Sequence, residues 1–190
     1  MKRGIEMKRV CIFLADGFEE VEALTVVDLL RRADVKIDMV SISDSLSVRG
    51  RSNIEVTADL MWEESNAEKA DMLILPGGMP GVKYLGEHKG LTELIKKYAE
   101  EGKKLAAICA APTVFGQLGI LKGKKATCYP GLEDKLIGAD ISTDEDESVI
   151  TDGNITTSRG VGTAIPFALC LITILEDKAI SDRVKRGIVY

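Results

Sequence analysis

The sequence predicts an α/β protein in which a mostly parallel β-sheet carries helices on both faces. Its apolar, β-rich runs do not alternate with polar residues, as expected for strands that are buried on both sides. Segments with helical periodicity separate one run from the next. The chain of 190 residues contains no internal repeat, low-complexity tract or Pro/Ser-rich linker. We therefore expect a single domain over residues 1–190.

The first half of the chain is predicted to alternate strands with helices. Strands are predicted at residues 9–15, 36–43 and 71–78, with a short hairpin arm at 54–60. A helix over residues 91–102 ends at a glycine. An amphipathic helix is predicted over residues 19–33, with an inward face formed by Val21, Leu24, Val27 and Leu30.

The second half continues the same alternation. Strands are predicted at residues 104–110 and 125–129, and residues 148–158 are expected to fold into a hairpin around Asp152-Gly153-Asn154. A short helix over residues 112–119 opens with proline, which the first turn of a helix tolerates. A long apolar helix at 162–176 and a terminal helix at 178–186 complete the chain.

Charge and hydropathy exclude several classes of function. The net charge is −5, and the Lys and Arg residues are spread along the chain, so we expect neither nucleic acid nor a membrane as partner. The longest apolar run, residues 164–175, is shorter than the about 20 residues that cross a bilayer. No secretion signal is recognised near residue 10, so a cytoplasmic protein is expected. The sequence M-K-R occurs at residues 1–3 and 7–9, so the start can be Met1 or Met7. If it is Met7, residues 1–6 are expected to be a flexible extension.

Cysteine and histidine usage narrows the chemistry. The four cysteines form no C-x-x-C pair and are expected to be reduced thiols: Cys11, Cys109, Cys128 and Cys170. His88 is the only histidine and lies in a polar segment, where we expect a surface residue. A Cys-His dyad would have to use it. We expect no metal and no cofactor.

Three loops are expected to meet at one edge of the sheet. They are residues 16–22 after the first strand, 76–81 after the third and 109–113 after the fourth. In open parallel sheets, sites form outside the carboxyl ends of the strands. If these strands are neighbours, the three loops line one crevice.

Cys109 lies between a predicted strand and a predicted helix, flanked by small residues. The N-terminal end of a helix favours an anion, so a cysteine here is expected to have a lowered pKa and to react as the thiolate. A sharp strand-to-helix turn also presents the nucleophile of many hydrolases. The alternative is that Cys109 is a small apolar core residue, as free cysteines often are.

Acidic residues and glycines supply the other candidates. One interpretation is that the acidic residues only complement the dipole of the first helix: Glu19, Glu20 and Glu22. The other is that Glu19 or Glu22, which share a helix face, leans toward Cys109. The N–H groups of Gly77 and Gly78 can bind an oxyanion, or these glycines only permit positive φ.

At these residues the sequence resembles the ThiJ/PfpI superfamily and, within it, the DJ-one (DJ-1) branch. The motifs are A-x-G-x-E-E-x-E (15–22), V-D-x-x-R-R-A (27–33), L-P-G-G (75–78), A-A-I-C-A-x-P-T (106–113) and T-S-R-G-x-G-T (157–163). The resemblance runs from about residue 8 to the C-terminus. It implies a flavodoxin-like three-layer sandwich, a homodimer, a reactive Cys109 and an essential acid at Glu22, protonated and hydrogen-bonded to the sulfur.

Two departures from the family pattern bear on activity. The segment T-C-Y-P places Tyr129 where this branch often has histidine, and tyrosine is a poor base near neutral pH. Ala110 follows the cysteine where the peptidase-like branch has histidine, which argues against a protease. Glutamine amidotransferase relatives require a histidine after the cysteine, and this chain has none after Cys109. Arg159 is expected to support the crevice or the dimer interface.

The resemblance favours an enzyme of the glyoxalase or deglycase type that acts on small dicarbonyls or glycated proteins. Cys109 would form a hemithioacetal, Glu22 would move protons, and the amides of Gly77, Gly78 and Ala110 would hold the oxyanion. The alternative is a redox-responsive chaperone or stress sensor, in which Cys109 is oxidised to the sulfinate. A role in thiamine-related metabolism ranks third.

Overall fold

The protein is built around one seven-stranded sheet. The structure, a computed structural model, describes residues 7–144 and 146–190. The strands run in the order β10-β11-β7-β6-β1-β2-β5, and only β10 is antiparallel to its neighbour. Their bounds are β1 Arg9–Leu14, β2 Lys36–Ser41, β5 Leu60–Met61, β6 Met72–Leu75, β7 Lys104–Ile108, β10 Val149–Asp152 and β11 Ile155–Ser158. The mostly parallel sheet that the sequence predicts is confirmed.

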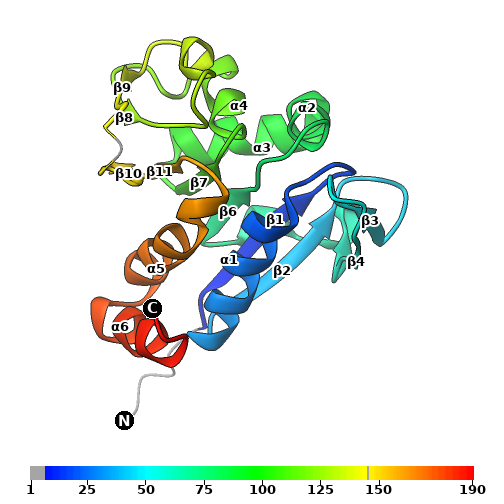
Figure 1. Ribbon diagram of the computed structural model, residues 1–190. Helices are drawn as coiled ribbons and strands as arrows, with labels where there is room; N and C mark the ends of the chain where they lie inside the picture. Colours follow the sequence, from blue (N-terminus) through cyan, green and yellow to red (C-terminus); the bar gives the residue numbers. More distant parts are fainter. Residues whose placement is uncertain (1–6, 145) are drawn as a thin grey trace.

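Helices cover both faces of this sheet. Figure 1 shows α1 (Glu20–Arg32), α5 (Ala164–Leu175) and α6 (Lys178–Gly187) packed together on one face. The other face carries α2 (Gly81–Glu87) and α3 (Lys89–Glu100). The short helix α4 (Pro112–Gln117) follows β7 and contacts α2. The strands β1 and β6 are almost fully buried between these layers, which explains why they read as continuous apolar runs.

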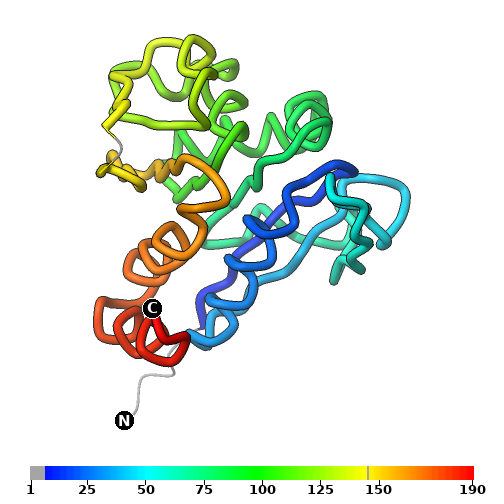
Figure 2. Tube along the Cα trace, in the orientation of Figure 1, coloured from blue at the N-terminus to red at the C-terminus, as the bar shows by residue number. Residues whose placement is uncertain are grey.

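Two small sheets stand outside the central one. The strands β3 (Ser47–Arg49) and β4 (Glu55–Thr57) form an antiparallel hairpin, as expected near residues 54–60, and Figure 2 shows it at the edge of the molecule. The strand expected at 125–129 is shorter: only β8 (Lys125–Ala126) pairs, with β9 (Asp140–Ile141). After Ala126 the chain turns toward the central sheet: the N–H of Thr127 is donated to Thr157 Oγ1, and the N–H of Tyr129 is donated to the carbonyl of Cys109.

Short 3₁₀ segments connect these elements. Their bounds are η1 Trp62–Glu64, η2 Ala67–Lys69, η3 Glu133–Lys135 and η4 Val161–Thr163. His88 lies between α2 and α3 and is more than the plain surface residue expected, since its Nδ1 accepts the N–H of Leu91 and caps α3. Its ring also lies edge-on to Trp62.

The inward face predicted for the first helix is partly wrong. Val27 and Leu30 are buried in the core, but Val21 is 49% exposed and Leu24 is 36% exposed. The helix is rotated so that Glu22 and Ala23 face the protein interior at its N-terminal end. Apolar spacing alone does not reveal this rotation, because a buried carboxyl occupies the place of an apolar side chain.

The sheet order brings together the loops that matter for function. The strands β7, β6 and β1 are adjacent, so the loops at their carboxyl ends meet at one edge, as the sequence predicts. In the described part of the chain, no helix is long and apolar enough to cross a bilayer. The extension expected at residues 1–6 lies outside the described residues.

Candidate functional site

Cys109 lies at the sharp turn that follows β7. Its φ is +65°, a left-handed conformation that costs a non-glycine residue about 1–2 kcal/mol. The turn is held from both sides: the N–H of Cys109 is donated to the carbonyl of Ser158 at 2.9 Å, and its carbonyl accepts the N–H of Tyr129 at 2.8 Å. A strained backbone kept in place by its surroundings is a common feature of functional sites.

Glu22 projects from the first turn of α1 toward this cysteine. Its side chain is fully buried, and Oε2 accepts the N–H of Gly77 at 2.9 Å. The Cys109 thiol lies beside this carboxyl group, and each of the two groups shifts the pKa of the other. Among the described residues, Oε1 has no hydrogen-bond partner, so this oxygen faces the place where a proton or a substrate atom can sit.

Gly77 allows the two side chains to approach each other. A Cβ at this position would lie 2.5 Å from Glu22 Oε2, 2.5 Å from Cys109 Cβ and 2.9 Å from Cys109 Sγ. Any larger residue would therefore collide with both groups. Gly78 is required for another reason: its φ is +94°, and an added Cβ would strike the backbone N of Glu19.

Burial governs the acidity of this pair. Loss of solvent raises the pKa of the Glu22 carboxyl from 4.5 to about 7, and the hydrogen bonds from Cys109 and Gly77 oppose this only in part. Burial, and then the charge of Glu22, raises the pKa of the Cys109 thiol to about 12. The two groups therefore hold one proton between them over a wide range of pH.

Two expectations for this site need correction. The expectation that Cys109 has a lowered thiol pKa is wrong. The N–H groups of Ala110 and Gly78 favour the thiolate, but desolvation and the Glu22 carboxylate outweigh them and raise the pKa. The N–H of Gly77 is already donated to Glu22, so it is not free for an oxyanion. The N–H groups of Gly78 and Ala110 remain beside the sulfur.

The three acidic residues of the first loop have separate contacts. Glu19 forms an ion pair with Arg51 at 3.4 Å. Glu20 accepts the backbone N–H of Ser52 at 2.8 Å and so anchors the loop between β3 and β4. Only Glu22 faces Cys109, which resolves the choice that the spacing of Glu19 and Glu22 leaves open.

A cavity of about 370 Å³ opens over Cys109. Its walls come from five segments of the chain and include Glu19, Glu22, Arg51, Cys109, Tyr129, Pro130, Arg159 and residues 160–163. The Tyr129 side chain is 52% exposed at the edge of this cavity. Tyr129 and Arg159 thus both lie at the site, as expected.

Sequence reasoning missed Arg51. This residue lies in the β3–β4 loop and reaches the site because the loop folds over the start of α1, where its own N–H is donated to the carbonyl of Phe18. Its charge lowers the pKa of Glu22, although burial outweighs it. The basic turn R-G-R at residues 49–51 was the available signal, but its distance in sequence from the motifs concealed it.

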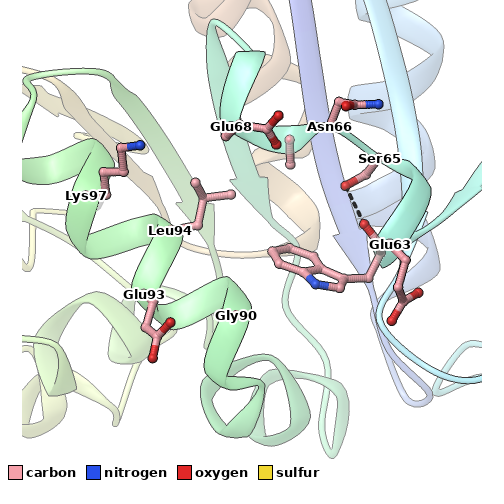
Figure 3. A pocket seen from close by; sticks show the side chains of 10 residues that line it. Glu63, Ser65, Asn66, Glu68, Gly90, Glu93, Leu94 and Lys97 are labelled. Carbon is pink, nitrogen blue, oxygen red and sulfur yellow. Dashed lines mark hydrogen bonds between the residues drawn. The ribbon is translucent and has the colours of Figure 1, made fainter.

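A second hollow, larger than the cavity over Cys109, lies elsewhere. It has a volume of about 530 Å³ and lies between η1, η2 and α3 (Figure 3). Its lining contains no cysteine, and the carboxylates of Glu68 and Glu93 come from opposite walls. The Ser65 hydroxyl there is donated to the carbonyl of Trp62. The larger of these two hollows therefore lacks a cysteine nucleophile.

The other cysteines differ from Cys109. Burial raises the pKa of Cys11 to about 11 and of Cys128 to about 12, and neither lines the cavity. Cys170 is half-buried rather than in the core, and its thiol contacts the Thr151 hydroxyl at 3.7 Å. Among residues 7–144 and 146–190, no group of three or more His, Cys, Asp or Glu side chains is arranged to hold a metal ion.

The chain is similar to known proteins over most of its length. A model of the DJ-1/PfpI family matches residues 8–174. The chain is 34% identical over 182 residues to Protein dj-1beta of Drosophila melanogaster, covering 96% of this chain and 97% of that protein. It is 34% identical over 154 residues to a protein of Pyrococcus abyssi that is named a deglycase, covering 81% of this chain and 91% of the relative.

A longer relative and a solved structure show the same similarity to DJ-1 proteins. Protein DJ-1 homolog B of Arabidopsis thaliana is 37% identical over 168 residues; these are 86% of this chain, which spans only 37% of that longer relative. Among solved structures, Toxoplasma gondii DJ-1, described as oxidized, superposes with a TM-score of 0.91 at 33% identity, covering 96% of this chain and 98% of the other. The flavodoxin-like architecture expected from the sequence is confirmed.

Proposed function

The chain belongs to the DJ-1/PfpI family, and from this premise we propose that it is a cysteine enzyme that acts on reactive dicarbonyls or on their early adducts with proteins. The observation that carries the proposal is the contact of Glu22 and Cys109 across Gly77 beneath an open cavity. The relative named a deglycase supports the same chemistry.

The first step is formation of a hemithioacetal. With the shared proton on Glu22, the Cys109 thiolate attacks the aldehyde carbon of methylglyoxal, and Glu22 gives its proton to the developing alkoxide. With a protein adduct, the sulfur attacks the carbinol carbon, the carbon–nitrogen bond breaks, and the released amine takes the proton. The N–H groups of Gly78 and Ala110 stabilise the negative charge.

The second step moves hydrogen between two carbons. The Glu22 carboxylate removes the proton from the carbon that carries sulfur and returns it to the neighbouring carbon. One carbon is oxidised and the other reduced, so no external oxidant is needed, and the product is a thioester of Cys109. Water then cleaves this thioester to lactate and restores the thiol. Tyr129 would donate a hydrogen bond at the cavity and is not required as a base.

Turnover by the purified protein tests these roles. We expect conversion of methylglyoxal to lactate, lost in Cys109→Ala and lowered about 10²–10⁴-fold in Glu22→Gln, the usual contribution of a general acid–base group. Cys170→Ala, a cysteine variant away from the cavity, is expected to retain activity. Undiminished turnover in either of the first two variants would contradict the assigned roles.

A second candidate function is a redox sensor. Cys109 is the cysteine that lines the cavity, and a solved relative is described as oxidized. A sulfinate at this position would accept hydrogen bonds from the protonated Glu22 and from backbone N–H groups. Mass spectrometry after mild peroxide treatment tests it: a gain of two oxygen atoms on Cys109, without dicarbonyl turnover, favours the sensor.

The homodimer implied by the resemblance remains part of this proposal. Val21 and Leu24 lie one turn apart on the exposed side of α1 and offer an apolar contact. We expect light scattering to give twice the monomer mass, and the double variant Val21→Glu with Leu24→Lys to give the monomer. A monomeric wild type would contradict this assembly.

A further inference from the structure

We propose that the hollow between α2 and α4 is a second subsite, which receives the peptide segment next to a modified residue. The inference rests on the proposed function and specifies its substrate: a peptide with an apolar side chain and a carboxylate near the adduct, rather than free methylglyoxal. The two hollows are lined by neighbouring residues of one turn: Cys109 lines the catalytic cavity, and Ala110 lines this hollow.

The hollow has the size and lining of a side-chain pocket. Its volume is about 360 Å³, and its walls are largely apolar: Met79, Val82, Ala110, Val114 and Leu132. Ala110 directly follows Cys109, whose own side chain lines the cavity. A substrate bound at the sulfur therefore has an apolar groove one residue away. Apolar pockets with a few placed polar groups are the usual form of ligand subsites.

Exposed apolar side chains surround both hollows. Met79 is 57% exposed at the groove, and Tyr129 and Val161 are 52% and 46% exposed at the cavity. Large apolar side chains exposed together mark surfaces that contact a partner. Methylglyoxal carries only one methyl group and covers little apolar surface, whereas a peptide that extends from Cys109 past Ala110 reaches the hollow that Met79 lines.

Charge at the groove favours an acidic neighbour. Lys83 and Lys135 both line it, and Lys83 is engaged by Glu87 at 3.9 Å. Among the described residues, no carboxylate lies within ion-pair distance of Lys135, which is exposed at the groove. A peptide carboxylate near this ammonium group would complete the pair and set the direction of the chain.

Gly86 offers a way to fill the groove without disturbing the fold. A Cβ at this position would lie 3.6 Å from Val114 Cγ2 and 3.7 Å from Gln117 Oε1, which are ordinary van der Waals distances. Gly86→Leu therefore places a side chain in the hollow. Gly187→Leu is the matched control, because Gly187 is exposed on α6 and a Cβ there meets nothing within 4 Å.

The experiment compares two substrates in the full-length protein. These are free methylglyoxal and its adduct on a peptide in which lysine is flanked by leucine and glutamate. We expect Gly86→Leu to lower kcat/KM for the peptide adduct about tenfold, equivalent to 1.4 kcal/mol, with little change for methylglyoxal. Lys135→Glu is expected to raise KM for the same adduct, and Gly187→Leu to change neither substrate.

The outcomes separate this inference from the proposed function. Unchanged peptide turnover in both Gly86→Leu and Lys135→Glu, or an equal loss for the two substrates, would overturn the subsite. Absence of turnover on both substrates in the wild type would overturn the enzyme instead. In that case calorimetric titration with the unmodified peptide still tests the subsite. We expect the peptide to bind the wild type and to bind Gly86→Leu more weakly.

Discussion

Glu22 and Cys109, 87 positions apart in the chain, contact each other across a single glycine that has no room for a side chain. The carboxyl comes from the first turn of α1, and the thiol comes from the turn between β7 and α4. Because both groups are buried, neither ionises easily, and the charge of one opposes ionisation of the other.

The shared proton predicts the pH dependence of thiol alkylation. The first proton leaves the pair near pH 7, and a fixed fraction of the remaining one-proton state is the thiolate with protonated Glu22. We expect the rate of reaction of Cys109 with iodoacetamide to rise through about pH 7 and then to level off. In Glu22→Gln this step disappears. The same step at the same pH in both proteins would exclude the shared proton.

Buried Glu22 also predicts how stability depends on pH. Its pKa is about 7 in the folded protein against an ordinary value of 4.5, so between these values the folded state holds a proton that the unfolded state has released. The stabilisation is therefore fully present below pH 4.5 and is lost as the pH rises to 7, by at most about 3 kcal/mol. Glu22→Gln lacks this loss.

Urea unfolding of both proteins at pH 4.5 and pH 8 measures this effect. The variant is expected to gain stability relative to the wild type on going from the lower to the higher pH. Comparing the two proteins cancels the contributions of all other titrating groups that the substitution leaves unchanged. A constant difference at both pH values would show that Glu22 is not held away from solvent.

The left-handed backbone of Cys109 predicts an order of stability between two inactive variants. Alanine at φ +65° retains the strain, whereas glycine adopts this conformation freely. We expect Cys109→Gly to be more stable than Cys109→Ala by about 1 kcal/mol, the cost of the left-handed region. Chemical denaturation at one pH measures the difference. A more stable alanine variant would mean that the turn is not left-handed in solution.

The close contacts around Gly77 predict that no side chain is tolerated at this position. Gly77→Ala would force apart Glu22 and Cys109, with a loss of activity and an overpacking cost of about 1–3 kcal/mol. Gly187→Ala serves as the control, because its Cβ has open space, and we expect unchanged activity and stability. Methylglyoxal turnover and thermal unfolding of both variants measure the effects. Full activity in Gly77→Ala would contradict the close approach.

Much of the architecture could be predicted from local patterns. Unbroken apolar runs identified β1, β6 and β7, and helical periodicity located α1, α3 and α5 near their observed bounds. The order of these elements placed three loops at the carboxyl ends of parallel strands, and the loops meet because β7, β6 and β1 are neighbours in the sheet. Cys109 was found in the same way, from its place between a strand and a helix.

Local patterns failed where a contact comes from a distant segment. The rotation of α1 exposes Val21 and buries Glu22, and Arg51 reaches the cavity from a separate hairpin. His88 caps α3 through Leu91, a role that its polar surroundings did not indicate. In each case a partner far away in sequence, or a single hydrogen bond, outweighed the average preference of the residue.

The sequence by itself determined the order of strands and helices along the chain and the residue types available at the carboxyl ends of β7, β6 and β1. Spacing left Glu19 and Glu22 open, and the resemblance implied Glu22. Only the tertiary structure decided that the Gly77 N–H is donated to Glu22, that Glu19 pairs with Arg51, and that the thiol pKa is raised rather than lowered. The physical reason is desolvation. The free energy of ionising a buried group depends on all the chain segments packed around it, and no local sequence pattern contains that information.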